Sequence, residues 1–116
     1  MLTVRIVNET RATLVGDSVE VADTGIRRLV GLLGRRGLVT GGGLWIRPSS
    51  GVHTVGMLFP IDVIGLDKTF RVIKLWRNLV PFRITSLSWA MHSVVELPSG
   101  RIAETEIQIG DSLRIG

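Results

Sequence analysis

The chain has 116 residues, a length that predicts a single domain over residues 1–116. It contains no cysteine, which excludes disulfides, thiolate catalysis and cysteine-based zinc or iron–sulfur sites. The formal net charge is +4, but most of the basic residues are arginine, scattered along the sequence without interleaved aromatic residues. We therefore expect no specific binding of nucleic acid.

Residues 2–22 have the pattern of a β meander. Apolar and polar residues alternate over residues 2–6 and again over residues 18–21, which is typical of half-buried strands. Residues 12–15 are expected to form a return strand between them. Gly16-Asp17 has the composition of a hairpin turn.

One amphipathic helix is predicted at about residues 24–35. Asp23 or Thr24 can cap its start, and Gly37 is placed to end it. Its apolar face has the spacing i, i+3, i+4, i+7 and consists of Ile26, Leu29, Val30 and Leu33. A helix this short gains most of its stability by docking such a face on the rest of the protein.

The remainder of the chain consists of short apolar segments separated by turns. The expected strands are 44–46, 61–66, 70–76, 93–97, 107–109 and 113–115. Residues 101–106 fit either a helical turn or a strand. Many short strands with one short N-terminal helix predict a mainly β fold, either a compact β-sandwich or a jelly-roll-like barrel.

Two polar residues of the middle third are candidates for chemistry. His53 titrates near neutral pH, so it could act as a base or ligand, or simply hydrogen-bond the backbone of its own loop. Asp62 is a carboxylate in an apolar run, so it has to face solvent, meet an arginine or accept hydrogen bonds from backbone amides. We expect His53 and Asp62 to hydrogen-bond, directly or through one water, at the mouth of a pocket. The pair then either forms a functional site or ties down the loop at residues 49–57.

Glu96 is a third candidate, because it interrupts an otherwise apolar strand. A pairing of Glu96 with Arg77 or Arg83 would be an ordinary buried or edge ion pair. His92 shares its strand face but lies roughly 13 Å away, which excludes a direct His92–Glu96 dyad. The histidines lack metal-ligand spacing and the glycine-rich phosphate-binding motifs are absent from the sequence, so we expect no metal and no cofactor.

Several segments together carry a resemblance to a known family. They include Gly43-Leu44-Trp45-Ile46-Arg47-Pro48, His53-Thr54-Val55-Gly56-Met57, Phe59-Pro60-Ile61-Asp62-Val63 and Val95-Glu96-Leu97-Pro98-Ser99-Gly100. With them the chain resembles domain-of-unknown-function family 192, a widespread bacterial and archaeal family. The resemblance implies a compact β-rich fold with one N-terminal helix, and it implies no activity. The motif positions it marks are His53, Thr54, Met57, Pro60, Asp62, Asp67, Glu96 and Gly100.

Three functions remain open from the sequence. The first is a small β-sandwich module that binds a ligand or partner near the loop at residues 49–62. Its candidate binding residues are His53, Thr54, Met57, Asp62 and Glu96. The second is a hydrolase-like enzyme that uses His53 with Asp62 or Glu96 as general base and acid, although no activated nucleophile accompanies them. The third is a structural or accessory domain with no small-molecule site.

The expected partners follow from the same features. They are an unknown small molecule or a protein, bound by a monomer or weak oligomer. The sequence has no apolar run of the length that a membrane span needs, so we expect no membrane insertion. Its first residues lack the charged and apolar regions of a signal peptide, so we expect a cytoplasmic location.

Overall fold

The computed structural model describes residues 2–30, 32, 35–51, 57–85 and 88–116, with the backbone alone for Ile26, Leu29 and Val30. The elements of these residues are β1 (Thr3–Asn8), β2 (Thr13–Ala22), α1 (Gly25–Val30), β3 (Gly42–Ile46), β4 (Ile61–Leu66), β5 (Val72–Leu79), β6 (Ser93–Pro98), α2 (Arg101–Thr105) and β7 (Leu113–Ile115). The predicted class is confirmed, since the fold is mainly β with a short N-terminal helix.

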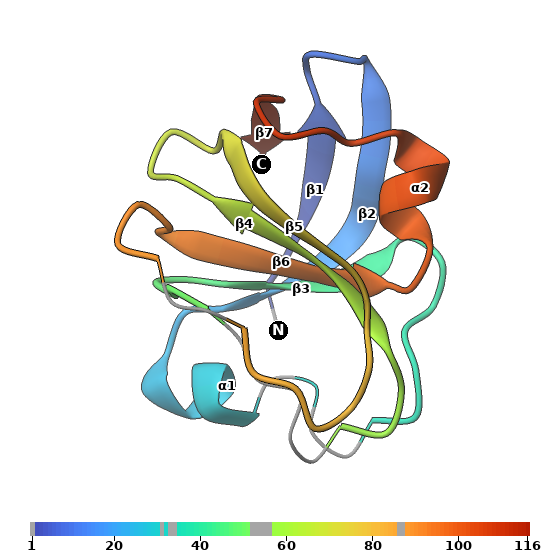
Figure 1. The fold of residues 1–116 in the computed structure, drawn as a ribbon, viewed down its shortest axis with the longest axis vertical. Coiled ribbons are helices and arrows are strands. Elements are labelled where there is room, and N and C mark those ends of the chain that lie inside the picture. The colour runs from blue at the N-terminus through green and yellow to red at the C-terminus, as the bar shows by residue number, and fades with distance from the viewer. Residues whose placement is uncertain (1, 31, 33–34, 52–56, 86–87) are drawn as a thin grey trace.

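All seven strands belong to one sheet with the order β5-β4-β6-β3-β2-β1-β7. Neighbouring strands are antiparallel except β2 and β3, which are parallel. The sheet curls into a half-barrel, as Figure 1 shows. Its two edges meet where Arg71, before β5, bridges Ser112, before β7, and where the N–H of Val72 donates to the carbonyl of Asp111 at 2.8 Å. The expected sandwich or jelly-roll barrel therefore takes the form of a single curled sheet.

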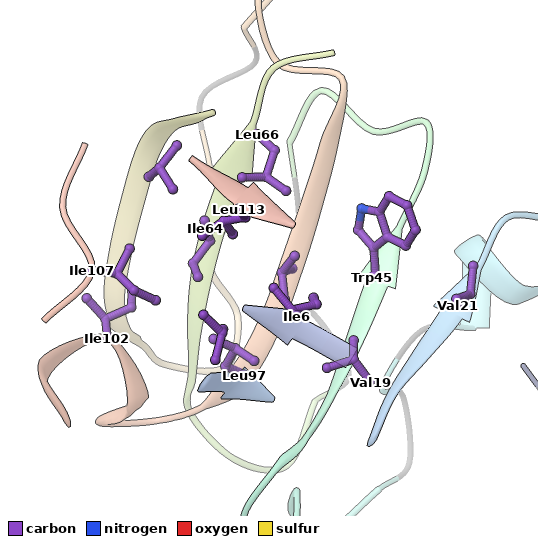
Figure 2. Close-up of a cluster of buried hydrophobic side chains, with 13 residues drawn as sticks. Ile6, Val19, Val21, Trp45, Ile64, Leu66, Leu97, Ile102, Ile107 and Leu113 are labelled. Atoms are coloured by element: carbon purple, nitrogen blue, oxygen red, sulfur yellow. The ribbon is translucent and has the colours of Figure 1, made fainter. Parts of the chain in front are cut away.

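The inner face of the curl carries the larger apolar cluster (Figure 2). All seven strands contribute to it, as do the helix α2 and the chain that follows it. This inner-face cluster consists of Ile6, Val15, Val19, Val21, Trp45, Ile64, Leu66, Val72, Val95, Leu97, Ile102, Ile107 and Leu113. Because every strand buries apolar surface in one place, the hydrophobic effect stabilises the curled shape.

A second apolar cluster covers the outer face of the sheet. This outer-face cluster consists of Ala22, Leu32, Leu44, Ile46, Met57, Ile61, Val63, Met91 and Val94. Its members combine outward-facing strand residues with Leu32, which follows α1, and with Met57 and Met91 from the connections before β4 and β6. These connecting segments therefore form a second layer on the outer face of the sheet.

The helix α1 begins where the sequence predicts. The N–H of Arg27 donates to Oγ1 of Thr24 at 3.2 Å, so Thr24 caps the first turn. The predicted apolar stripe of Ile26, Leu29, Val30 and Leu33 lies outside the described side chains. In the part of the chain that the structure describes, no helix is long and apolar enough to cross a membrane.

The predicted hairpin turn at Gly16-Asp17 is wrong. Thr13–Ala22 is one continuous strand, in which Gly16 pairs with Ile6 of β1. A Cβ atom at Gly16 would lie 2.8 Å from Cγ2 of Val19 and 3.1 Å from the carbonyl oxygen of Gly41. Glycine is thus needed here for close packing within a strand and not for a turn.

The C-terminal segment also differs from the prediction. Residues 107–109 are not a strand but the connection from α2 toward β7. Ile107 is buried in the inner-face cluster while Ile109 is 65% exposed. The two isoleucines have the spacing of a strand, but one is buried in the core and the other is exposed to solvent. The ambiguous residues 101–106 contain α2, so the helical alternative is the right one.

Candidate functional site

The carboxylate of Asp62 in β4 is held by three backbone N–H groups. Its Oδ1 accepts from Asn78 at 2.8 Å, and its Oδ2 accepts from Gly100 at 3.1 Å and from Ile102 at 2.8 Å. Gly100 is the N-cap residue of α2 and has no side chain with which to cap it. Asp62 supplies that cap from the neighbouring strand, and only 1% of the residue is exposed.

Of the environments weighed for Asp62, hydrogen bonding to backbone amides is the one observed. The donors belong to the end of β5 and the start of α2, so this carboxylate fastens both elements to β4. His53 lies outside the described residues. Its expected contact with Asp62 therefore stays a prediction.

Glu96 in β6 is in a very different setting. It pairs with Leu44 of β3 and Val63 of β4, which are both members of the outer-face cluster. Glu96 is only 4% exposed, and its buried Oε2 has no hydrogen-bond partner among the residues that the structure describes. Burial raises the pKa of Glu96 to about 7, against an opposing effect of the charge on Arg35. A buried polar atom left without a partner costs about 1–3 kcal/mol.

Asp62 and Glu96 are close in the sheet but lie on opposite faces. Asp62 pairs with Leu97 of the inner-face cluster, whereas Glu96 pairs with Val63 of the outer-face cluster. Successive side chains along a strand alternate between the two faces. The two carboxylates therefore do not form an acid–base pair with each other.

An ion pair borders Glu96 on the same face. Nη2 of Arg35 lies 2.6 Å from Oε2 of Glu20, and the two side chains are 36% and 28% exposed. Glu20 of β2 pairs with Leu44, which in turn pairs with Glu96. Glu20, Leu44 and Glu96 thus form one row across β2, β3 and β6. The ion pair of Glu20 with Arg35 lies at the more exposed end of this row.

The sequence allowed Arg77 or Arg83 as a partner of Glu96, but the structure points to a third arginine. The arginine whose charge acts on Glu96 is Arg35, and not Arg77 or Arg83. The sequence places Arg35 only near the end of a helix. Its proximity to Glu96 depends on the pairing of β2 with β3 and of β3 with β6, for which the local sequence carries no signal.

The remaining motif residues lie in different settings. Met57 is buried in the outer-face cluster, on the face that Glu96 also occupies. His53 and Thr54 lie outside the described residues. Asp67 accepts hydrogen bonds at Oδ1 from the N–H and hydroxyl of Thr69 and from the N–H of Arg71, within the turn between β4 and β5.

The pKa of Asp67 reflects this turn. Partial burial would raise it, but the hydrogen bonds from Thr69 and Arg71 hold the pKa of this carboxyl below its ordinary value. Asp67 therefore has a structural role in shaping the turn.

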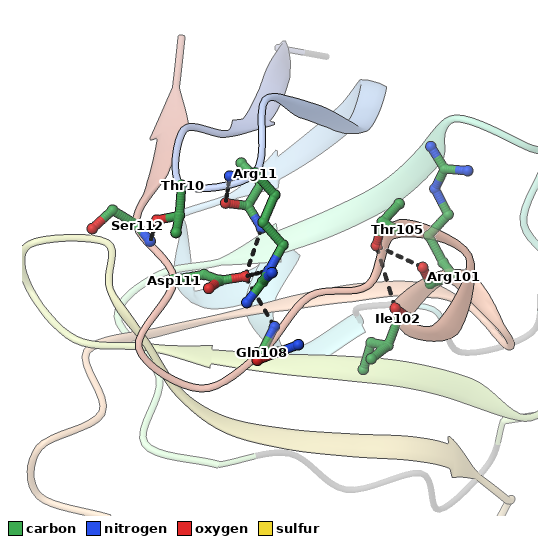
Figure 3. Close-up of polar contacts among 9 residues, drawn as sticks. Thr10, Arg11, Arg101, Ile102, Thr105, Gln108, Asp111 and Ser112 are labelled. Carbon is green, nitrogen blue, oxygen red and sulfur yellow. Dashed lines mark hydrogen bonds and ion pairs between the residues drawn. The ribbon is translucent and has the colours of Figure 1, made fainter.

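Asp111 was not singled out in the sequence, yet it organises the place where the sheet closes (Figure 3). Its Oδ2 accepts from Nδ2 of Asn8 at 2.8 Å, from Nε of Arg11 at 2.8 Å and from the N–H of Gln108 at 3.0 Å. Burial would raise the pKa of Asp111, but these hydrogen bonds and the charge of Arg11 hold it below its ordinary value. This network joins the turn after β1 to the segment before β7.

Among the side chains that the structure describes, no three His, Asp or Glu residues gather closely enough to hold a metal ion.

Comparison with known proteins places the chain in a family. The model of domain-of-unknown-function family 192 (DUF192), described as Uncharacterized ACR, matches residues 6–115. The chain belongs to this family. A UPF0127 protein of Pyrococcus horikoshii is 32% identical over 112 residues, covering 94% of this chain and 96% of the relative. A UPF0127 protein of Thermococcus kodakarensis is 32% identical over 115 residues, covering 91% and 69%.

Solved structures with the DUF192 fold of this chain are also known. A protein of unknown function from Novosphingobium aromaticivorans superposes with a TM-score of 0.81 at 22% identity, over 97% of this chain and 84% of that one. A Sinorhizobium meliloti protein, provisionally described as a transcription regulator, gives 0.80 at 21% identity, over 97% and 91%. At these identities the likeness shows the fold alone.

Proposed function

We propose that this DUF192 chain is a small ligand- or partner-binding module whose site lies on the outer face of β6, around Glu96 and beside the loop at residues 49–62. The observation that supports this is the buried Oε2 of Glu96, to which no described residue donates a hydrogen bond. Buried polar groups in native proteins are almost always paired, so an orphan calls for an explanation. A bound group that donates a hydrogen bond to Glu96 would remove its cost.

The position of Met57 supports the same location. Met57 packs in one cluster with Leu44 and Val63, the two residues that flank Glu96 across the sheet. The residues just before it include His53 and Thr54, which belong to the proposed site on sequence grounds. Asp62 is assigned a positioning role, because its carboxylate already accepts three backbone hydrogen bonds.

Mass spectrometry of small molecules and proteins that co-purify with the chain under native conditions tests the proposal. The key variant is Glu96→Gln, which keeps the shape of the side chain but cannot ionise. The matched control is Glu9→Gln, because Glu9 is 52% exposed and remote from the row. We expect the wild type and Glu9→Gln to retain a bound molecule that Glu96→Gln loses, with unchanged circular dichroism. Retention of the same molecule by folded Glu96→Gln would contradict the proposed site.

One observation favours a second candidate, the hydrolase-like enzyme. A carboxyl group with a pKa of about 7 is suited to general acid–base catalysis at neutral pH. In that case a panel of ester and amide substrates is cleaved by the wild type, and both His53→Ala and Glu96→Gln lose at least 100-fold in rate. An accessory domain without a small-molecule site is the outcome if neither binding nor cleavage depends on Glu96.

The other sequence-based expectations complete the proposal. The chain is expected to act as one domain over residues 1–116 and as a monomer or weak oligomer, which limited proteolysis and analytical ultracentrifugation test. Its expected cytoplasmic location is tested by cell fractionation. Titration with duplex DNA at physiological salt tests the expected lack of specific nucleic-acid binding.

A further inference from the structure

We infer that the site at Glu96 takes a small organic cation, a primary ammonium group carried on an apolar chain. This inference rests on the proposed function and specifies its ligand class. It is carried by three features of the outer face: the apolar surroundings of the carboxyl, the unpartnered oxygen, and the commitment of the neighbouring arginine to another acid.

The surroundings of Glu96 are apolar on both sides. Leu44 and Val63 flank it on the neighbouring strands, and Val94 precedes it on the same face of β6. The other buried members of the outer-face cluster are likewise alanine, leucine, isoleucine or methionine. A ligand that reaches Glu96 therefore meets one hydrogen-bond acceptor surrounded by apolar side chains. This environment matches a ligand with a single polar end and a hydrocarbon body.

Among the described side chains of this face, Glu96 has no counter-ion of its own. The two carboxyl groups of the row, Glu20 and Glu96, share one cation, Arg35, whose Nη2 is bonded to Glu20 at 2.6 Å. Of the other described cations, Lys74 of β5 also lies on the outer face, but it is exposed and pairs with Gly65 on the far side of β4 from β6. An ionised Glu96 therefore needs a positive charge from outside the described row.

An ammonium group fits this need better than a neutral donor. It donates a hydrogen bond to the orphaned Oε2 and supplies the missing positive charge, and such charge-assisted bonds are about twice as strong as neutral ones. An alcohol supplies the hydrogen bond alone. A bound anion would face the carboxyl of Glu96 across apolar surroundings, where repulsion is weakly screened.

The two kinds of ligand differ in their pH dependence. An ammonium ion binds the ionised form of Glu96, whose fraction rises from about one tenth at pH 6 to about nine tenths at pH 8 for a pKa near 7. The ammonium itself stays protonated over this range. Its affinity should therefore be about tenfold higher at pH 8 than at pH 6. A neutral alcohol can donate to the ionised carboxyl or accept from the protonated one, so its affinity should change little with pH.

The experiment titrates the full chain with n-butylammonium chloride and, as the neutral match, with n-butanol. Backbone amide shifts report where each probe binds, and the ¹³C shift of the Glu96 carboxyl reports its ionisation. We expect n-butylammonium to shift the amides of Leu44, Val63 and Glu96, to bind about tenfold more tightly at pH 8 than at pH 6, and to lower the pKa of Glu96. Glu96→Gln should abolish this binding, and Glu9→Gln should leave it unchanged.

The contrary outcomes separate the ligand class from the proposed site. Binding of n-butanol at these residues with an affinity equal to that of n-butylammonium would contradict the proposed cationic ligand. It would not contradict the proposed location of the site. Absence of any shift at Glu96 with n-butylammonium, measured directly in the wild type, would also overturn the cation. The proposed function itself fails if the co-purifying molecule is retained by folded Glu96→Gln, or if neither binding nor cleavage depends on Glu96.

Discussion

Asp62 and Asp111 each accept three hydrogen bonds from neighbouring segments, whereas Glu96, buried to a similar degree, has a buried oxygen to which no described residue donates. The two aspartates fasten α2 and the closing edge of the sheet, so their hydrogen bonds have an evident structural purpose. Glu96 joins nothing in the described part of the fold. The two carboxylates that hold this fold together accept several donors each, and a buried carboxylate oxygen without a donor is better explained by a group that the fold does not itself supply.

The largest effect is expected from Asp62→Ala. The substitution leaves three N–H groups without their acceptor, two of them in the first turn of α2, and should lower the free energy of unfolding by roughly 3–5 kcal/mol. Urea unfolding at pH 7 measures this loss. The control is Asp67→Ala, where the aspartate accepts as many hydrogen bonds but the donors lie in an exposed turn that water can solvate, so about 1 kcal/mol is expected. Equal losses in the two variants would mean that burial does not distinguish these carboxylates.

Glu96→Gln should act in the opposite direction. The folded pKa of about 7 exceeds the ordinary value of 4.5, so the folded state binds more protons than the unfolded state between these values. The contribution of Glu96 to stability is therefore fully present below pH 4.5 and declines as the pH rises to about 7, by roughly 3 kcal/mol in all. Glutamine does not ionise. The stability of the variant relative to the wild type should therefore increase as the pH rises from 4.5 to about 7, and the difference should stay constant at higher pH. Chemical unfolding of both proteins at pH 4.5, 6 and 8 measures the difference, and a difference independent of pH would contradict it.

Asp111→Asn should be destabilising by about 2 kcal/mol at neutral pH, because the amide oxygen can still accept at the position of Oδ2 but the ion pair with Arg11 is lost. Its pH dependence has the sign opposite to that of Glu96. The folded pKa of Asp111 lies below its ordinary value of 3.8, so its stabilising contribution is present above that value and is lost as the pH falls through the folded pKa. Thermal unfolding between pH 2 and 7 should show an acid loss in the wild type that is smaller in the variant. A variant that loses stability in acid as steeply as the wild type would remove Asp111 from this role.

The fold was predictable from the sequence where its determinants are local. Alternating apolar residues marked β1 and most other strands, and the capping residue Thr24 marked the start of α1. The prediction failed at Gly16, because a glycine chosen for close packing has the same appearance in sequence as a glycine chosen for a turn. Neither the single curled sheet nor its edge contact at Arg71 and Ser112 could be deduced, since both depend on long-range pairing.

The candidate site was predictable in part, for a similar reason. Glu96 was recognisable because a carboxylate in an apolar strand is unusual on its own. The donors to Asp62 lie 16 to 40 residues away from it, and the row of Glu20 and Glu96 joins strands that are remote in sequence. Which carboxylate is saturated and which is orphaned depends on these distant contacts. The sequence could therefore nominate both residues but not assign their different roles.

The smallest change in stability is expected from Glu20→Gln, which also tests how Arg35 affects the ionisation of Glu96. The ion pair that it removes is about one third exposed on each side, so its loss should change the free energy of unfolding by less than about 1 kcal/mol. The substitution nevertheless releases Arg35 from its partner while leaving its charge beside Glu96. A freed guanidinium favours the ionised form of Glu96, so the pKa of that carboxyl should fall and the pH window of declining stability should end below pH 7.

Direct ¹³C titration of the Glu96 carboxyl in Glu20→Gln and in Arg35→Met provides the measurement. Arg35→Met removes the lowering charge and should raise the pKa of Glu96, which is the opposite of the change expected in Glu20→Gln. If both variants leave this pKa unchanged, the charge of Arg35 does not reach the carboxyl, and the apolar surroundings alone set its ionisation. If the two shifts have opposite signs, Arg35 is shared between the two acids. A bound ammonium group would then supply the positive charge that Glu96 lacks because Arg35 is bonded to Glu20.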